Sequence, residues 1–270
     1  MKKVRKILSM LLLTLVAFLV LLFLLSPIVA VVGASFSNSG YFSFPPEEWG
    51  FKQYQLALKN KEHLASLSAS LKVATMATCA SALLCIPACI ALAKTTNPKV
   101  KMFKNLFLAP IFLPGIVWAV GLLQCMGVLN LQGSLPLLIC VHTIIATPYM
   151  IRIVGASMDG FNYTLEDAAA SLGAPPLVTF FRITLPNIIS GVAVAMVFCF
   201  MISFSDVVIT SFVSSSNITT YPVRIYSAMR SEGLDPMVLA YSAIIIVLTL
   251  VISIIGEKFA HWTKHFSSAF

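Results

Sequence analysis

The chain has 270 residues, of which 59% are hydrophobic and only 10% are charged. Ordinary soluble domains carry roughly a quarter charged residues, so this composition excludes a water-soluble globular protein and indicates residence in a lipid bilayer. The net charge of +8 comes from lysines and arginines at the edges of apolar segments. These basic residues have no interleaved aromatic side chains, so membrane orientation explains the charge and no nucleic-acid partner is expected.

Charge-free apolar runs predict six transmembrane helices, because a helix needs about 20 residues to cross a hydrocarbon core of about 30 Å. They are expected at 7–32, 73–93, 105–128, 135–151, 188–213 and 237–256. A polar turn around Gly133 and Ser134 divides the long run between 105 and 151 into two helices. The predicted fold class is therefore an all-α, polytopic membrane protein.

The first apolar run shares features with a signal peptide, namely a basic start and small residues at Val32, Gly33 and Ala34. Its length exceeds the roughly 7 to 15 residues of a signal peptide's apolar region. We therefore expect an uncleaved transmembrane anchor.

The distribution of basic residues predicts the orientation of the spans, because lysines and arginines are retained on the cytoplasmic side. Most of them lie in segments that share a side with the N-terminus. We expect both termini and the loop 157–187 in the cytoplasm, and the spans in the inner (plasma) membrane of a bacterium. The predicted organisation is an N-terminal anchor with an external loop (1–64), a core transmembrane domain (65–260) and a cytoplasmic tail (261–270).

Chemistry-bearing motifs are scarce along the chain. No Gly-x-x-x-x-Gly-Lys-Ser/Thr phosphate loop, nucleophile elbow or paired His-Glu metal helix is present. We therefore predict no catalytic residue, no metal site and no cofactor bound by this chain. The six cysteines fall inside predicted spans without metal-ligand spacing, and we expect them to act as small packing residues rather than disulfide or zinc partners. They are Cys79, Cys85, Cys89, Cys125, Cys140 and Cys199.

Prolines interrupt several predicted spans, at Pro87, Pro110, Pro114 and Pro148. Breaks of this kind persist in membranes only where protein or a water-filled cavity satisfies the freed backbone groups. They are compatible with a translocation path and equally with ordinary helix bending.

Asp206 is the only acidic residue inside a predicted span. A buried carboxylate is costly, so it either meets a cationic solute, pairs with a basic residue of a partner, or lies close enough to the surface to be hydrated. Ser203 beside it, and Tyr221 and Tyr226 in the outer loop that follows, complete a candidate solute path, although these tyrosines also suit an interfacial aromatic belt. We interpret His142 as a hydrogen-bonded core residue rather than a ligand.

The loop between the fourth and fifth spans contains a short helix signature. Thr164 and Asp167 have the spacing of a capping box, so a helix of about two turns is expected to begin at Leu165. Gly173, followed by Pro175, is a stop signal. Acidic residues in the first turn favour the positive end of the helix dipole.

This loop resembles the EAA loop of permease subunits in ATP-binding cassette importers. The matching positions are Asp167, Ala168, Ala169, Gly173, Ile183, Leu185 and Pro186. Asp167 stands where the family usually has glutamate, and Glu166 immediately precedes it. The resemblance spans about residues 65–255 and includes the segments 70–74, 86–94 and 110–117, which resemble the second and third spans of type I permeases.

Within this family the sequence is most similar to the spermidine/putrescine permease subunit of the second type, through segments 203–206, 220–226 and 234–236. The resemblance implies a polyamine as the solute, with phosphonate, iron or another small ion as alternatives. A secondary carrier is the rival from another class. Such a carrier is expected to show several intramembrane charges or an inverted repeat, whereas one acidic residue and one docking motif are present here.

The resemblance implies a set of partners. Two cytoplasmic ATPase subunits bind ATP and dock on the EAA loops of this chain and of a second permease subunit, either a paralogue or another copy. An external solute-binding protein delivers the solute. Closure of the ATPases pulls on the short helix from Asp167 to Gly173, which transmits the motion and switches the pore. The further coupling residues are Glu166, Ile183, Leu185 and Pro186.

Overall fold

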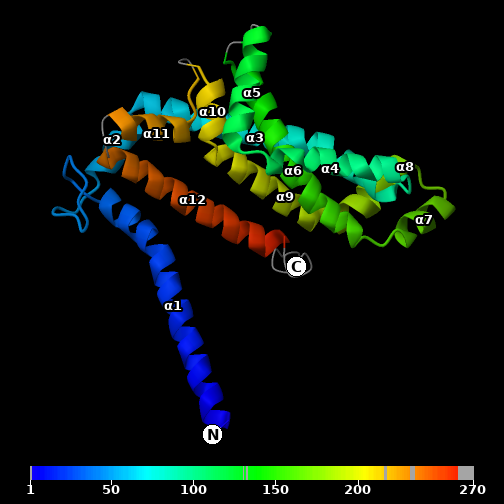
Figure 1. The fold of residues 1–270 in the computed structure, drawn as a ribbon, viewed down its shortest axis with the longest axis horizontal. Coiled ribbons are helices and arrows are strands. Elements are labelled where there is room, and N and C mark those ends of the chain that lie inside the picture. The colour runs from blue at the N-terminus through cyan, green and yellow to red at the C-terminus, as the bar shows by residue number, and fades with distance from the viewer. Residues whose placement is uncertain (1, 130, 132, 216–217, 232–234, 261–270) are drawn as a thin grey trace. The chain divides into compact units, whose positions relative to one another are not determined.

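The computed structural model describes residues 2–129, 131, 133–215, 218–231 and 235–260 (Figure 1). Within these ranges the regular structure is helical, with two isolated β-bridges and no strand, which confirms the predicted all-α fold. The predicted tail, 261–270, lies outside the described residues. The elements are α1 (Lys2–Ser35), α2 (Lys52–Lys59), α3 (Lys61–Lys94), α4 (Pro98–Phe112), α5 (Gly115–Val128), α6 (Leu135–Asp159), α7 (Thr164–Ser171), α8 (Pro176–Thr179), the π-helix η1 (Phe180–Thr184), α9 (Leu185–Ser205), α10 (Val208–Val213), α11 (Tyr221–Ser231) and α12 (Pro236–Ala260).

Helix length and composition agree with a polytopic membrane protein. Four of the described helices are long and apolar enough to cross a bilayer: Ser9–Ala34, Lys61–Lys94, Leu135–Asp159 and Pro176–Ser205. The bent pair Leu106–Phe112 and Gly115–Val128 adds a fifth candidate, and Pro236–Val251 is a shorter apolar helix. Each of the six predicted spans therefore has a helical counterpart.

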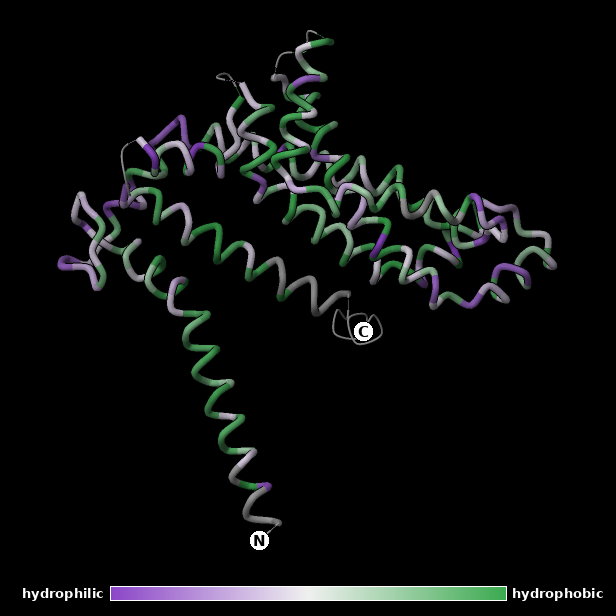
Figure 2. Tube along the Cα trace, in the orientation of Figure 1, coloured by the Kyte–Doolittle hydropathy of each residue, from purple (hydrophilic) through white to green (hydrophobic). Residues whose placement is uncertain are grey.

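The described chain divides into two compact units, with boundaries after Leu64, Tyr226 and Thr249. The first unit contains α1, α2 and the N-terminal part of α12. Side chains along most of α1 are exposed and apolar, and its colour in Figure 2 is correspondingly green. A helix that is hydrophobic all round requires lipid or another protein around it.

Within the first unit, Tyr241 of α12 joins the segments on either side of Asn60. Its hydroxyl donates a hydrogen bond to the carbonyl of Ala57, and its ring stacks on His63 with centroids 5.2 Å apart. These contacts fix the start of α12 beside the junction of α2 and α3.

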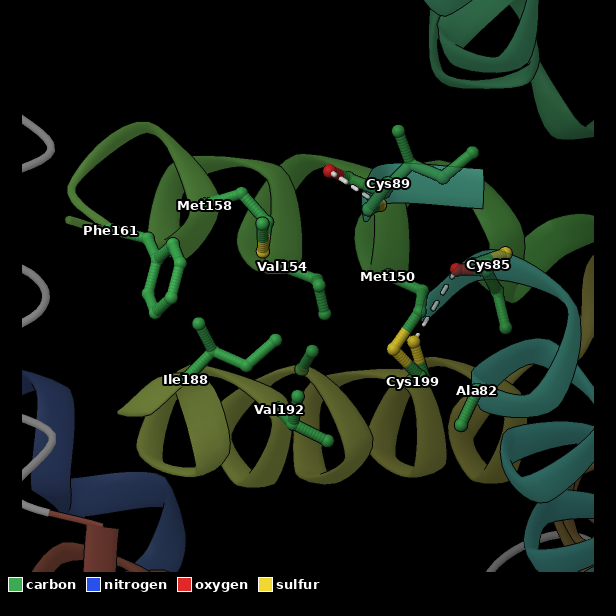
Figure 3. Close-up of a cluster of buried hydrophobic side chains, with 13 residues drawn as sticks. Ala82, Cys85, Cys89, Met150, Val154, Met158, Phe161, Ile188, Val192 and Cys199 are labelled. Carbon is green, nitrogen blue, oxygen red and sulfur yellow. Dashed lines mark hydrogen bonds between the residues drawn. The ribbon is translucent and has the colours of Figure 1, made fainter. Parts of the chain in front are cut away.

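The second unit is built around the pair α6 and α9. Figure 3 shows Met150, Val154 and Met158 of α6 facing Ile188 and Val192 of α9, and all five are buried. The continuation of α6 beyond the predicted end at 151 explains this contact, because its last two turns bury apolar side chains while Arg152 stays exposed. Arg152, whose charge suggested that the fourth span ends at 151, lies on the exposed side of a helix that continues to Asp159.

Small side chains are buried along α3, and three of them, Ala82, Cys85 and Cys89, belong to this core. They recur at three- and four-residue intervals on one face and are buried, as expected where membrane helices approach closely. The buried positions are Ser66, Ser70, Val73, Ala74, Ala77, Thr78, Ser81, Ala82, Cys85 and Cys89. The helix begins at Lys61, a full three turns before the predicted start of the second span.

The cysteines follow the prediction in part. Cys85, Cys89 and Cys199 are buried in the core between α3, α6 and α9, where Cys199 donates to the carbonyl of Ala146 at 3.3 Å. The others, Cys79, Cys125 and Cys140, are exposed on the isolated chain. All six are free thiols.

The third span, expected at 105–128 with prolines inside it, is sharply bent. The chain bends by 113° between α4 and α5. Leu113 adopts an extended conformation, φ −95° and ψ 134°, because the residue before a proline is driven out of the helical region. Pro114 therefore ends α4 completely instead of kinking it.

The prediction of a single fifth span at 188–213 is wrong. Helix α9 ends at Ser205, Asp206 is extended with φ −68° and ψ 124°, and α10 begins at Val208. The run contains no charge other than Asp206 and no proline near the break, so hydropathy alone gave no sign of it. Asp206 thus lies at a helix junction and not within a helix.

Candidate functional site

The segment expected to couple this chain to an ATPase, residues 157–187, folds as α7, α8 and η1 at one end of the α6 and α9 pair (Figure 1). Helix α7 has the predicted two turns but begins at Thr164, so the predicted capping box is wrong. Tyr163 is the N-cap residue and makes no side-chain cap, while Oδ1 of Asn162 accepts from the Thr164 amide at 3.1 Å and from the Thr164 hydroxyl at 2.7 Å. An asparagine side chain can accept from the amide two residues on. The hydroxyl of Thr164 is used in this turn, and the Asp167 amide bonds the carbonyl of Tyr163 instead.

The end of α7 matches the prediction. Gly173 has φ +80°, a left-handed backbone conformation that residues other than glycine rarely adopt. Its amide donates to the carbonyl of Ala170 at 2.9 Å, and the amide of Ala174 donates to the carbonyl of Ala169 at 3.0 Å. This pair of bonds is the Schellman motif, which closes the helix with its last carbonyls satisfied.

Glu166 ties α7 to the rest of the second unit. Its Oε2 lies 2.5 Å from Nζ of Lys94 at the end of α3, and its Oε1 accepts from the hydroxyl of Thr184 at 2.5 Å. Partial burial alone would raise the pKa of Glu166, but the hydrogen bonds from Lys94 and Thr184 and the charge of Lys94 outweigh it and lower the pKa. The carboxylate is therefore ionised at neutral pH and held in place by Lys94 and Thr184.

The other face of α7 is open. Asp167 and Ala168 are exposed, whereas Ala169 is only 7% exposed and packs inward. Leu172 is 89% exposed just beyond the helix, and Leu177 and Phe181 follow as exposed large hydrophobic residues. We call Asp167, Ala168, Leu172, Leu177 and Phe181 the docking face, because they are the exposed acidic, small and large apolar residues of this loop, and exposed apolar side chains suit a protein partner.

The remaining residues of the loop motif lie at the junction of η1 and α9. Ile183 and Leu185 are half-buried and pack against the core of the second unit, and Pro186 is exposed in the first turn of α9. The π-helix Phe180–Thr184 precedes this turn. A proline clashes with the carbonyl four residues before it, which is that of Arg182, and a wider turn at that place relieves the clash.

The second candidate site is the junction of α9 and α10. Oδ2 of Asp206 accepts from the amide of Thr210 at 2.8 Å and from its hydroxyl at 2.6 Å. His142 of α6 completes the cluster, with Nδ1 2.7 Å from Oγ of Ser203 and Nε2 3.0 Å from Oγ1 of Thr210. His142, Ser203 and Thr210 are all buried.

Tyr221 and Tyr226, expected in a loop, lie instead on α11. Tyr221 is fully buried, and its amide donates to Oγ of Ser70 at 2.7 Å. Tyr226 is exposed. The structure thus brings Ser203 and Asp206 together and places the two tyrosines on a separate helix that packs against α3.

Sequence reasoning missed the partners of both acidic residues. Lys94 and Thr184 are distant from Glu166 in sequence, and Thr210 was an ordinary position in an apolar run. The presence of His142 in a charge-free span was the one available signal, because a polar side chain in a membrane helix normally has a hydrogen-bond partner inside the protein.

Comparison with known proteins establishes the class. Residues 8–265 match the family described as binding-protein-dependent transport system inner membrane component, and the chain belongs to this family. It is a type I permease subunit of an ATP-binding cassette importer, located in the inner membrane.

Individual relatives refine the likeness. The chain is 28% identical to the spermidine/putrescine transport system permease protein PotC of Escherichia coli K12, over 88% of this chain and 89% of that protein. It is 30% identical to the molybdenum transport system permease protein ModB of Mycobacterium bovis, over 72% and 78%. The fold matches a chain of a bacterial transporter that imports the acidic polysaccharide alginate, with a TM-score of 0.70, 15% identity and coverage of 95% and 96%.

Proposed function

We propose that this permease subunit forms half of a translocation path for a polyamine such as spermidine or putrescine. Asp206 is the observation that carries this proposal. Its carboxylate lies at a break in a membrane helix and one of its oxygens, Oδ2, is used by Thr210. A carboxylate at such a place attracts ammonium groups and repels oxyanions.

Similarity to a known permease also supports a polyamine as the solute. The relative PotC is named for spermidine and putrescine transport, and both solutes carry ammonium groups. The relative ModB is named for molybdenum transport, so an oxyanion or another small ion is the alternative solute. The sign of the charge at residue 206 favours the cation.

ATP hydrolysis comes from separate ATPase subunits in this proposal. The docking face receives one of them, and Glu166 transmits its motion, because the same carboxylate contacts the ends of two membrane helices through Lys94 and Thr184. A second permease subunit, a paralogue or another copy, completes the path, and an external binding protein delivers the solute. Both termini and α7 lie in the cytoplasm.

Uptake into proteoliposomes tests the solute. The complete transporter, reconstituted with its ATPase, second permease and binding protein, is supplied with labelled putrescine and with ATP in the absence of an ion gradient. We expect ATP-dependent uptake that spermidine inhibits and that molybdate and aminoethylphosphonate leave unchanged. Inhibition by either anion, with none by spermidine, would replace the polyamine by an anionic solute.

Accessibility labelling tests the orientation. A Leu172→Cys variant, in a background where Cys79, Cys125 and Cys140 are alanine, carries one thiol on the docking face. An impermeant maleimide is expected to label it in inverted membrane vesicles and not in intact cells. Labelling only in intact cells would place the docking face outside and exclude its coupling role.

A further inference from the structure

The hydrogen bonds around Asp206 have a defined direction. A carboxylate oxygen accepts hydrogen bonds, and the single hydroxyl proton of Thr210 goes to Oδ2 of Asp206. Oγ1 of Thr210 must then accept from Nε2–H of His142. In this neutral tautomer Nδ1 of His142 is an acceptor, and the hydroxyl of Ser203 donates to it. The relay therefore runs from Ser203 through His142 and Thr210 to Asp206.

Three helices contribute to this relay. Ser203 belongs to the last turn of α9, His142 to α6 and Thr210 to α10, while Asp206 is the extended residue between α9 and α10. His142 is 1% exposed and Thr210 is fully buried, so the hydrogen bond between these two side chains is shielded from water. Hydrogen bonds in such surroundings are strong, and a partner left unsatisfied is costly.

Only one oxygen of the carboxylate takes part. Among the described residues, none donates a hydrogen bond to Oδ1 of Asp206, and the residue is half-buried. The relay thus immobilises the carboxylate through Oδ2 and leaves Oδ1 with its acceptor capacity unused. That capacity matches the hydrogen-bond donors of an ammonium group.

We propose that His142 and Thr210 are positioning residues that hold the Asp206 carboxylate at the helix break with Oδ1 directed to a cationic solute. This inference rests on the proposed role of Asp206 in the solute path. His142 and Thr210 act through Asp206 and do not contact the solute. Their contribution to transport therefore exists only while residue 206 is a carboxylate.

A double-mutant cycle in the reconstituted transporter tests the proposal. Thr210→Val removes the hydroxyl with little change in shape, and Thr210→Ser keeps it. We expect Thr210→Val to lower the rate of putrescine uptake by roughly tenfold, the size of the loss of one hydrogen bond to a charged group. Thr210→Ser should stay within about twofold of the wild type, since the donor to Asp206 remains.

The Asp206→Asn background provides the decisive comparison. There, Thr210→Val should change uptake by less than about twofold, because the group that Thr210 positions has already lost its charge. A purely structural role of Thr210 would make the two losses additive. Additive losses, or a Thr210→Ser variant as impaired as Thr210→Val, would overturn the positioning role.

The matched control is Thr143→Val on α6. Its hydroxyl bonds the carbonyl of Ile139 within its own helix, so loss of this hydroxyl should leave putrescine uptake unchanged. If Thr210→Val fails to assemble with its partner subunits, His142→Leu and His142→Gln repeat the comparison from α6. Glutamine keeps a donor for Thr210 and should retain more uptake than leucine.

The outcomes separate the two proposals. Unchanged putrescine uptake by Asp206→Asn would remove Asp206 from the solute path, and the positioning role would fail with it. Reduced uptake by Asp206→Asn together with additive effects of Thr210→Val would retain the solute path and reject the relay alone.

Discussion

Glu166 and Lys94 form an ion pair with 2.5 Å between Oε2 and Nζ, although one lies on the coupling helix α7 and the other ends the membrane helix α3. The second carboxylate oxygen binds Thr184, next to α9. A single side chain therefore connects the docking face to two membrane helices. Asp167, the residue that aligns with the acidic position of the loop motif, points to solvent instead.

This connection predicts a graded loss of stability. Glu166→Gln removes the charge and keeps an acceptor for Thr184, whereas Glu166→Ala also leaves the buried Thr184 hydroxyl without its partner. We expect losses of under about 1 kcal/mol for glutamine, because Lys94 is half-exposed and such pairs are weak, and about 1–3 kcal/mol for alanine. Thermal unfolding of the detergent-solubilised protein measures both.

The exposed neighbour supplies the control for that series. Asp167→Asn should leave the unfolding temperature unchanged, because surface substitutions away from specific contacts have small effects. Equal destabilisation by Asp167→Asn and Glu166→Ala would show that the contacts of Glu166 with Lys94 and Thr184 do not stabilise the fold.

The pH dependence of stability follows from the lowered pKa of Glu166. A carboxylate whose folded pKa lies below the unfolded value of 4.5 stabilises the fold above pH 4.5, and this stabilisation is lost as the pH falls through the folded pKa. The stability difference between the wild type and Glu166→Gln should be constant between about pH 7 and pH 5.5 and shrink below 4.5. Unfolding temperatures measured across this range check it, and a difference that grows on acidification would reverse the sign.

Gly173 is predicted to be intolerant of side chains for conformational reasons alone. A Cβ atom would meet nothing within 4 Å, but φ is +80°, so Gly173→Ala should cost about 1 kcal/mol. Gly173→Asn should cost less, because asparagine tolerates this region. We expect ATP-dependent uptake to fall in the order glycine, asparagine, alanine, with unchanged membrane insertion. Equal uptake by all three would show that the turn need not be left-handed.

Gly191 allows α6 and α9 to approach at Ser157. A Cβ atom on Gly191 would lie 1.7 Å from Oγ and 2.8 Å from Cβ of Ser157. We expect Gly191→Ala to destabilise the protein by about 1–3 kcal/mol through overpacking. Rescue by Ser157→Gly in the double variant, followed by thermal unfolding, is the check, and absence of rescue would locate the strain elsewhere.

The docking face can be tested without disturbing the fold. Leu172→Asp places a charge on a side chain that is 89% exposed, so stability should change by no more than about 0.5 kcal/mol. Copurification of the ATPase and ATP-dependent uptake should both fall, because the new charge must be desolvated at an apolar contact. Ala169, which is buried, is unsuitable for this test. Normal copurification with Leu172→Asp would exclude the docking face as the ATPase contact.

Local sequence patterns were sufficient for the features that short-range physics controls. Apolar runs located the membrane helices, since each must fill the bilayer by itself, and the spacing around Gly173 predicted the end of α7 because a left-handed glycine closes a helix locally. The sequence predicted the surroundings of the solute-path candidates only in part. Ser203 and Asp206 are neighbours, but Tyr221 and Tyr226 proved to lie on α11, whose short amphipathic stretch did not stand out from a loop.

Tertiary structure alone decided which polar groups from different helices meet. Thr210, which donates to Asp206, meets His142 from a different helix, and Glu166 pairs with Lys94 of α3. Hydropathy records the preference of each residue for lipid or water and contains no information about which distant side chain will be its neighbour. Such pairings exist only after the helices have packed, so they are properties of the folded chain.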